Sequence, residues 1–567
     1  MKTLKYKIRK IILLSPAFLF VLLTGLNVNI MGQDILVQMA PLEGNNIKTW
    51  LYNTGIFNQD LRTTNHPGFQ WPAGSGKYAV FTTGLSIGAY VNGQLREVMA
   101  SWAGEYANGY VVDSAGIPVP RTDNRFKIYS VKPTDNWINN PYWLNWGLMV
   151  PFGAPYVDVN NNGIYEPLID TPGVKGAVHT LFICLTDGFV ESHSSGEGFG
   201  GGTLPLYAEL HLTAWCYNLP GLEDVQFLKW VVINRNNSTW NNTYFSIVCD
   251  PDLGYANDDY VGCDTNRNMG YCYNGDNDDD PNQPYSYGQD PPAVGFDLLK
   301  GSVNKHVSPP VVYNMTSFDH FTGTSTPGPA CEKDPNGEPE PAYQFMRGYK
   351  KDRTPWVIPN TNPPQTTKYC YSGDPETQTG WTESKGSVFN CGGSLYGTTI
   401  SVNPVGERRF VMSSGADGLT VNPGDTQTIM IAQFIARGTS NLNSVTKLKQ
   451  LDDFIQAFVD NGFVIGINPV SNKVPSQYIL YQNYPNPFNP VTKLKFEIPY
   501  EVKSEKSKVK IVIYDVLGRE VEVLLNEKLS PGTFEVEWDA SNYPSGLYFC
   551  RLISDEISIT KKMVFLK

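Results

Sequence analysis

The sequence predicts an all-β protein, with a large β-sandwich-like body that has long loops and a small C-terminal β-sandwich. Three observations predict this class. Aromatic residues make up 13% of the 567 residues, with 32 Tyr and 12 Trp. They occur in short runs with β-branched residues, which favour strands. Glycine (52) and proline (41) separate these runs, more often than in an average protein but below the level of disordered chains.

The first 32 residues are typical of a cleavable export signal. Residues 2–10 are basic, residues 11–26 are mostly apolar, and polar residues follow. The apolar stretch is shorter than the roughly 20 residues that span a membrane. Gly32 suits the last position before cleavage at Gln33. An uncleaved anchor is the alternative, because residues 11–33 carry no charge. No later segment reaches membrane-spanning length, so we expect no stable transmembrane segment after signal cleavage.

The charge excludes one class of partner. The formal net charge of −11 falls to −16 once the five cations of the signal are removed. Binding to nucleic acid depends on neutralising phosphates, and an acidic surface repels them. We therefore expect no nucleic acid partner. Such a surface favours divalent cations.

Residues 33–467 form a β-rich extracellular body. We expect its strands at 78–83, 86–91, 180–185, 207–217, 227–234, 243–248, 410–413 and 428–436. Residues 207–217 alternate, which predicts one face in a core and the other partly wet. The strands at 227–234 and 243–248 predict a hairpin with a long loop. One helix is expected over 444–457, with Ser444 as its N-cap.

The nine cysteines all follow the signal, eight in the body and Cys550 near the C-terminus. They form no C-x-x-C pair, which excludes zinc-ribbon and thioredoxin motifs. In an oxidising compartment some would pair. Free buried thiols are the alternative, and the sequence does not give the pairing.

The stretch 158–170 matches the first half of a calcium loop. Oxygen-bearing side chains alternate at positions one, three and five, and a glycine at position six makes the sharp turn. The candidate ligands are Asp158, Asn160, Asn162, the backbone of Ile164, Glu166 and Asp170. Position twelve is Ile169, so the EF-hand pattern fails, and the loop resembles the wider Asp/Asn-rich calcium loops of secreted proteins. A turn that needs no ion is the alternative.

A second acidic stretch, residues 249–264, carries five carboxylates within fifteen positions. Carboxylates this close repel one another unless they are solvated, protonated or bridged by a cation. Calcium or another hard cation is therefore expected, with a solvated acidic loop as the alternative. The candidate ligands are Asp250, Asp252, Asp258, Asp259 and Asp264. A third stretch, 276–280, predicts an exposed loop.

Known catalytic motifs do not occur in the sequence. It contains no G-x-S-x-G, H-E-x-x-H, P-loop or G-x-G-x-x-G pattern, and the six histidines show no ligand spacing. The glycine run at 197–203 lacks the lysine of a phosphate loop and predicts a mobile surface loop. A glycosidase needs only two carboxylates, so this possibility stays open.

The C-terminal region predicts short strands joined by tight turns. Strands are expected at 492–498, 509–514, 534–538, 546–552 and 557–565. They describe a small immunoglobulin-like β-sandwich. Its expected core residues are Phe496, Val509, Ile511, Ile513, Val536, Trp538, Tyr548 and Val564. A polar linker, residues 468–476, precedes it.

The motifs YPNPFNP, VKIVIYDVLGREV, the G-x-Y at 546–548 and the final KKMVFLK agree in order and spacing with one family. Residues 477–567 resemble the type A C-terminal sorting domain of type IX secretion cargo. The resemblance implies a bacterium with two membranes, binding of this domain to the type IX secretion machinery, and a secreted or cell-surface protein.

The sequence leaves two function classes open for the body. Its strings DPDLGYANDDYVGCD and QFMRGY resemble uncharacterised secreted proteins with the same tail, which supplies no activity. The first class is a structural, adhesive or binding protein with calcium-stabilised loops and a cell-surface or polysaccharide ligand. The alternative is a secreted calcium-dependent hydrolase that acts on polysaccharide.

Export should remove the first 32 residues, because the tripartite pattern ends at Gly32. N-terminal sequencing of the secreted protein is expected to start at Gln33. A mature protein that starts at Met1 would contradict the signal peptide.

Overall fold

The computed structural model describes most of the body and tail. The described residues are 37–62, 66–110, 123–193, 198–326, 328–359, 361–385, 391, 403–463, 468–471, 477–499, 507–529, 532–541, 543–554 and 557–567. The predicted signal peptide lies outside them. The chain divides into two compact units, Met1–Leu451 and Asp452–Lys567.

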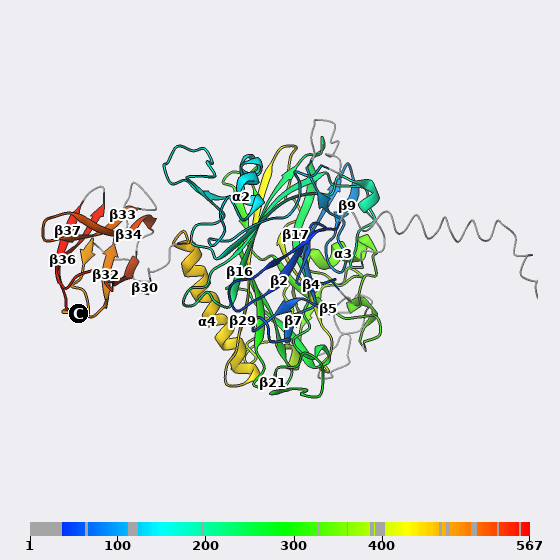
Figure 1. Ribbon diagram of the computed structural model, residues 1–567. Coiled ribbons are helices and arrows are strands. Elements are labelled where there is room, and N and C mark those ends of the chain that lie inside the picture. The colour runs from blue at the N-terminus through cyan, green and yellow to red at the C-terminus, as the bar shows by residue number, and fades with distance from the viewer. Residues whose placement is uncertain are drawn as a thin grey trace, which may run out of the picture. The chain divides into compact units, whose positions relative to one another are not determined.

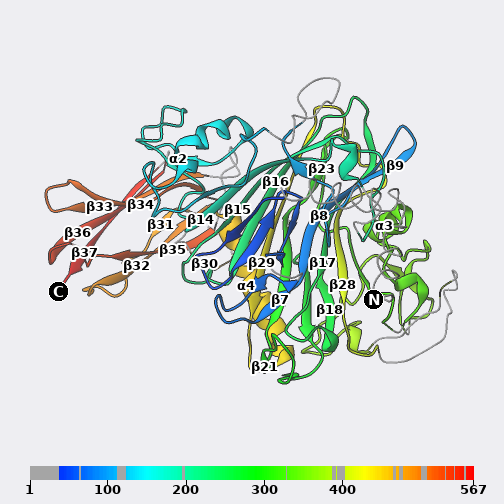
Figure 2. The same ribbon diagram turned by 45° about the vertical axis from the view of Figure 1, so that its right-hand side comes forward.

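Two antiparallel sheets form the body in the described part of the chain (Figures 1 and 2). The first has the order β1 (Met39–Leu42), β2 (Thr49–Tyr52), β3 (Ile56–Phe57), β8 (Thr82–Val91), β17 (Trp240–Asp250), β28 (Arg409–Gly415) and β25 (Ser317–Phe321), with β9 (Gln94–Val98) on β8. The second has the order β10 (Ala107–Asn108), β14 (His179–Thr186), β15 (Ala208–Cys216), β16 (Val225–Asn234), β29 (Thr426–Ala436), β22 (Ala293–Lys300), β19 (Met269–Asn274) and β18 (Asp259–Asp264), with β11 (Tyr129–Val131) on β14.

One apolar core joins the two sheets. It combines Ile87 and Ile247 of the first sheet with Leu212, Trp230 and Ile431 of the second, all buried. The prediction of an all-β protein is confirmed. Most of the expected body strands are present and longer by one to four residues at an end. The expected strand 78–83 is instead divided between β7 and β8, and β15 is one residue shorter than expected at each end.

The predicted hairpin between 227–234 and 243–248 is wrong. β16 pairs with β15 and β29, whereas β17 pairs with β8 and β28 in the opposite sheet. The connection therefore crosses from one sheet to the other. Both strands carry apolar side chains toward the shared core, and this pattern is the same for a hairpin and for a crossover.

The partly wet face expected for residues 207–217 is also wrong. Every residue of β15 is buried. On its second face, His211 contacts the ring of Phe152, with 5.5 Å between centroids. Glu209 there accepts hydrogen bonds from the Arg235 guanidinium at 2.8 and 3.0 Å. The polar side chains on this strand therefore include a buried carboxylate that is paired with an arginine at the surface.

The predicted helix is α4 (Asn441–Asp460), which begins three residues earlier than expected. The N-cap expected at Ser444 is wrong, because Ser444 lies inside the first turn, where its hydroxyl donates to the carbonyls of Pro291 at 2.7 Å and Ser440 at 2.9 Å. Leu448 packs beside Gly295 of β22, so α4 lies against the second sheet.

Shorter elements decorate the body. Two helices are α2 (Pro141–Asn145) and α3 (Pro339–Met346). Small two-stranded sheets pair β4 (Gln59–Asp60) with β5 (His66–Pro67), β6 (Phe69–Gln70) with β7 (Tyr78–Val80), β12 (Tyr156–Val157) with β13 (Thr171–Pro172), β20 (Asp278–Asp279) with β21 (Gly288–Gln289), β23 (Ser302–Asn304) with β24 (Val311–Tyr313), and β26 (Trp356–Ile358) with β27 (Gln365–Thr367).

The tail consists of two four-stranded sheets among its described residues. One has the order β30 (Asn468–Ser471), β35 (Gly532–Asp539), β32 (Val491–Ile498) and β31 (Ile479–Leu480). The other has the order β34 (Glu520–Leu529), β33 (Ser507–Asp515), β36 (Gly546–Ser554) and β37 (Ser558–Phe565). Both contribute to one core, which includes Phe496 and Ile513.

Seven of the eight core residues predicted for the tail are buried, and Val564 is the exception. Val564 is only half-buried, while its neighbours Met563 and Phe565 are fully buried. Apolar residues occupy both faces at this end of β37, so their pattern does not fix which face is inside.

The linker prediction is wrong for four of its residues. Residues 468–471 form β30, which pairs with β35, and so belong to a tail sheet. Residues 472–476 lie outside the described residues. The border between the two units, after Leu451, also falls before the expected end of the body at 467. Among the described residues, no helix has the length and apolar character needed to cross a membrane.

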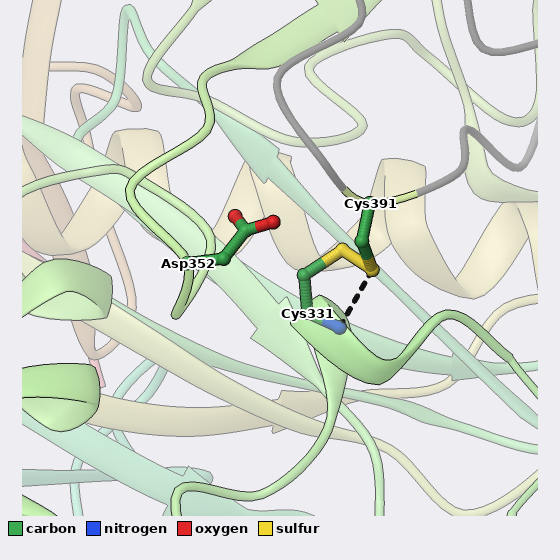
Figure 3. Close-up of side chains that lie close together, drawn as sticks. All are labelled: Cys331, Asp352 and Cys391. Atoms are coloured by element: carbon green, nitrogen blue, oxygen red, sulfur yellow. Dashed lines mark hydrogen bonds between the residues drawn. A yellow bond between two sulfur atoms is a disulfide. The ribbon is translucent and has the colours of Figure 1, made fainter.

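All nine cysteines are described, and two of them form a disulfide. Cys331 and Cys391, 60 positions apart, are bonded, and the backbone N–H of Cys331 lies 2.9 Å from Cys391 Sγ (Figure 3). The other seven cysteines are free and buried. Pairing and free buried thiols, the two alternatives that the sequence left open, therefore each hold for part of the nine cysteines.

Replacing both bonded cysteines by serine should destabilise the body. A cross-link over 60 residues restricts the unfolded chain, which stabilises the folded state by about 4 kcal/mol. Urea unfolding of the Cys331→Ser/Cys391→Ser variant should show a loss of that order. The matched control is reductant, which should lower the stability of the wild type and leave the variant unchanged. If reductant leaves the stability of the wild type unchanged, this would contradict a stabilising role of the disulfide.

Candidate functional site

The Asp158 loop joins β12 to β13, which hold its two ends together (Tyr156 pairs with Pro172). The Asp158 carboxylate accepts hydrogen bonds from the backbone N–H of Asn162 at 3.1 Å and of Gly163 at 2.7 Å. Gly163 has φ +75°, which glycine adopts at little cost. The turn expected at position six is therefore present.

Three side chains of this loop meet at one oxygen. The side-chain amides of Asn160 and Asn162 donate to Glu166 Oε2, at 2.7 and 2.5 Å. The same amides, rotated by half a turn, would present their oxygens to a cation beside Glu166. Hard oxygen donors of this kind suit calcium. The side chain of Ile164 is 66% exposed, so its contribution would come from its carbonyl.

Asp170 does not have the position expected of a calcium ligand. Its two carboxylate oxygens accept the backbone N–H groups of Val159 at 2.9 Å and Glu166 at 2.7 Å. It closes the base of the loop and is 2% exposed. Asp158 is used in the same way, because its two oxygens accept the N–H groups of Asn162 and Gly163. The two aspartates hold the loop, and Asn160, Asn162, Ile164 and Glu166 remain the candidate ligands.

The five carboxylates of 249–264 do not form one cluster. Asp250 and Asp252 lie at the end of β17, next to Arg409. Asp258 and Asp259 lie at the start of β18, near Asp279. Asp264 ends β18 and faces two cations, Arg267 at 2.9 Å and Lys449 at 3.7 Å. These cations compensate its charge, so Asp264 has no excess charge that would attract a metal ion.

Arg409 is the centre of the Asp250 group. β17 and β28 are antiparallel neighbours in which Cys249 pairs with Phe410, so Asp250 and Arg409 lie at the same end of the sheet. The guanidinium lies 3.5 Å from Asp250, 2.6 Å from Asp334 and 2.6 Å from Glu407. It also stacks on the indole of Trp102, 4.4 Å from the ring centroid.

This group carries more negative than positive charge. Asp250, Asp252, Asp334 and Glu407 surround the single guanidinium of Arg409. Trp102 Nε1 donates to Asp250 Oδ2 at 2.6 Å, while Asp250 Oδ1 is buried without a hydrogen-bond partner. Burial raises the pKa of Asp250 to about 7. Burial, and then the charge of Asp250, raises the pKa of Asp252 well above its usual range.

A third group of acids holds loops in place. Asp279 accepts the backbone N–H groups of Tyr255 at 2.9 Å and Tyr287 at 2.5 Å, and Asp259 accepts that of Leu253 at 3.1 Å. Both carboxylates are fully buried. Residues 276–278 are exposed as expected, and Asp279 is the buried exception. Burial raises the pKa of Asp258 to about 6.

The glycine run expected to be a mobile surface loop is packed in its described part, residues 198–203. Gly201 N–H donates to Glu97 at 3.2 Å, and Gly202 N–H donates to Glu105 at 2.7 Å. A Cβ on Gly201 would lie 2.4 Å from Glu105. His193, also buried, lies 3.6 Å from Glu105. The sequence gives no signal for this group, because its members are about 100 positions apart.

Potential metal ligands of the Asp, Glu, His and Cys types come together in a group of three at one place in the described residues, namely Cys331, Asp352 and Cys391 (Figure 3). The two sulfurs are joined as a disulfide and are not thiolates. This group therefore does not fit a thiolate-bound metal.

Asp250→Asn should flatten the dependence of stability on pH. The folded-state pKa of about 7 lies above the unfolded value near 3.9, so the stabilising contribution is present at low pH and is lost as the pH rises toward 7. Between pH 5 and 7 the free energy of unfolding of the wild type should fall by up to about 3 kcal/mol through ionisation of Asp250. The neutral variant should not show this loss. Chemical unfolding in EDTA at several pH values measures the free energy of unfolding of both proteins.

The matched control is Asp278→Asn, because Asp278 is exposed. Its pH profile should equal that of the wild type. Equal pH slopes for Asp250→Asn and the wild type would contradict the raised pKa.

Comparison with known proteins identifies the C-terminal region. Residues 482–566 match the family model described as a secretion system C-terminal sorting domain. No curated protein matches the chain. A solved polysaccharide lyase aligns with 85% of this chain and 46% of its own length, at 7% identity and a TM-score of 0.16. The alignment covers about half of that structure. Its TM-score is too low to support a conclusion about fold or function.

The motifs of the tail, its two-sheet fold and this match agree. Residues 482–566 are a type IX secretion C-terminal sorting domain, which directs the chain to the cell surface or the medium.

Proposed function

We propose that the chain is a structural or adhesive protein of the bacterial cell surface, with calcium bound by the Asp158 loop. The observation that supports this proposal is the meeting of Asn160, Asn162 and Glu166 around one point, with Asp158 holding the turn. Calcium would replace the two hydrogen bonds that the side-chain amides of Asn160 and Asn162 donate to Glu166. It would also join the two ends of the loop, which lie at β12 and β13.

The packing of the body favours a structural role over catalysis. The core between the two sheets combines a large apolar cluster with buried polar side chains that are hydrogen-bonded to one another, such as Asn58 to Thr83 at 3.0 Å and to Gln433 at 2.8 Å. The described carboxylates of the body mostly accept backbone N–H groups or face arginine and lysine. Groups used in this way stabilise loops.

One observation favours the second candidate, a calcium-dependent hydrolase acting on polysaccharide. Asp250 and Asp252 are neighbouring carboxylates whose pKa values are raised, and Trp102 lies beside them. Glycoside hydrolysis needs two carboxyl groups, one of them kept protonated as the acid, and a raised pKa supplies the protonated one. Loss of polysaccharide cleavage in both Asp250→Asn and Asp252→Asn would favour the hydrolase, and absence of any cleavage by the wild type favours the structural role.

Calcium should stabilise the body, and Asp158→Ala should remove that gain. A ligand at 100 times its dissociation constant adds about 2.7 kcal/mol. Thermal melts with calcium and with EDTA measure the difference. Asp252→Ala should remove a further part if the Arg409 group also binds a cation.

Asp278→Ala is the matched control, since it removes an exposed aspartate from a different acidic loop. It should keep the full calcium shift. Identical melts of the wild type in calcium and in EDTA would overturn the calcium proposal.

A further inference from the structure

The turn between β33 and β34 places two aliphatic residues in water. Val516 is 62% exposed and Leu517 is 74% exposed. Tight turns favour Gly, Pro, Asn, Asp and Ser, and these two residue types have little turn preference. Other connections of the tail carry such residues, as in SPG at 530–532 and SNYPSG at 541–546. Local structure therefore does not explain Val516 and Leu517.

The turn is held rigidly in this exposed form. Asp515 Oδ1 accepts the backbone N–H groups of Leu517 at 2.9 Å and Arg519 at 3.0 Å. Its Oδ2 accepts from the Arg519 side chain at 2.7 Å. Gly518, at φ +75°, completes the reversal. The hydrogen bonds present the two aliphatic side chains in a fixed position.

Two more exposed leucines lie at the same end of this sheet. Asp515 at the end of β33 pairs with Tyr548 near the start of β36, and Gly546 pairs with Phe565 at the end of β37. This register brings the turn, Leu547 and Leu566 to one end. Leu547 is 41% exposed and Leu566 is 52% exposed. We call Val516, Leu517, Leu547 and Leu566 the apolar end.

We infer that the apolar end is the surface through which the sorting domain binds the type IX secretion machinery. Its four residues lie outside the hydrophobic core of the tail. Exposed aliphatic side chains at one end of a sheet, outside its core, are typical of an interaction surface. The occupant follows from the domain, because residues 482–566 match a sorting domain, which the export machinery must bind. The inference rests on that assignment.

The fixed geometry supports this occupant. A preformed surface loses little conformational freedom on binding, which favours recognition of many cargo molecules by one receptor site. Departures from local sequence preference that cost stability are expected at functional positions. Arg519, at the base of the turn, is paired with Asp515, so the charges beside the aliphatic residues compensate each other.

The test uses the full chain in a host with a type IX secretion system. Val516→Ser/Leu517→Ser should lower the exported fraction at least about tenfold, since burial of two aliphatic side chains in the complex is lost. Val516→Ile/Leu517→Met keeps the apolar character and should be exported like the wild type. The matched control is Val523→Ser, which replaces a residue 40% exposed in β34.

Three further measurements separate the outcomes. Circular dichroism and melting of each purified variant should equal those of the wild type, so that loss of export is not loss of folding. Export of the Ser/Ser variant at the wild-type level would overturn the inference, as would equal losses in Val523→Ser. Export of the wild type in a host that lacks the machinery would instead overturn the sorting assignment.

Discussion

The body depends on the apolar contact between its two sheets. Every long strand carries side chains into this core, and chain crossings such as β16 to β17 occur because both sheets must contribute to it. The ends of the strands then decide where the polar groups lie. Asp250 and Arg409 meet because β17 and β28 are neighbours in register. The acidic group is a consequence of strand pairing around the core.

Buried carboxylates serve mainly as acceptors for loop backbones. Long connections need partners for N–H groups that do not reach a strand. Asp187 accepts from Leu206 and Ala208, and Asp279 accepts from Tyr255 and Tyr287. A side chain with two strong acceptor oxygens can hold two amides at once. This explains why an acidic composition accompanies long loops, and why many acids are inside.

Local patterns in the sequence predict the strands well and their partners poorly. The alternation of Leu494, Phe496 and Ile498 gives the correct buried face, because neighbouring residues alone determine it. The hairpin at 227–248 fails, since its pattern does not specify a sheet. The position-by-position match at 158–163 predicts the turn at Gly163. The group around Arg409 is not predictable, because Trp102, Asp250 and Asp334 come from distant segments and only the fold brings them together.

The raised pKa values of buried aspartates make folding of the body a proton-consuming reaction near neutral pH. Asp250 and Asp258 have folded-state pKa values of about 7 and about 6, whereas the unfolded carboxyl groups are ionised at pH 7. Each molecule that folds therefore takes protons from the buffer. The heat of folding then includes the ionisation heat of that buffer, and its apparent enthalpy differs between phosphate and Tris.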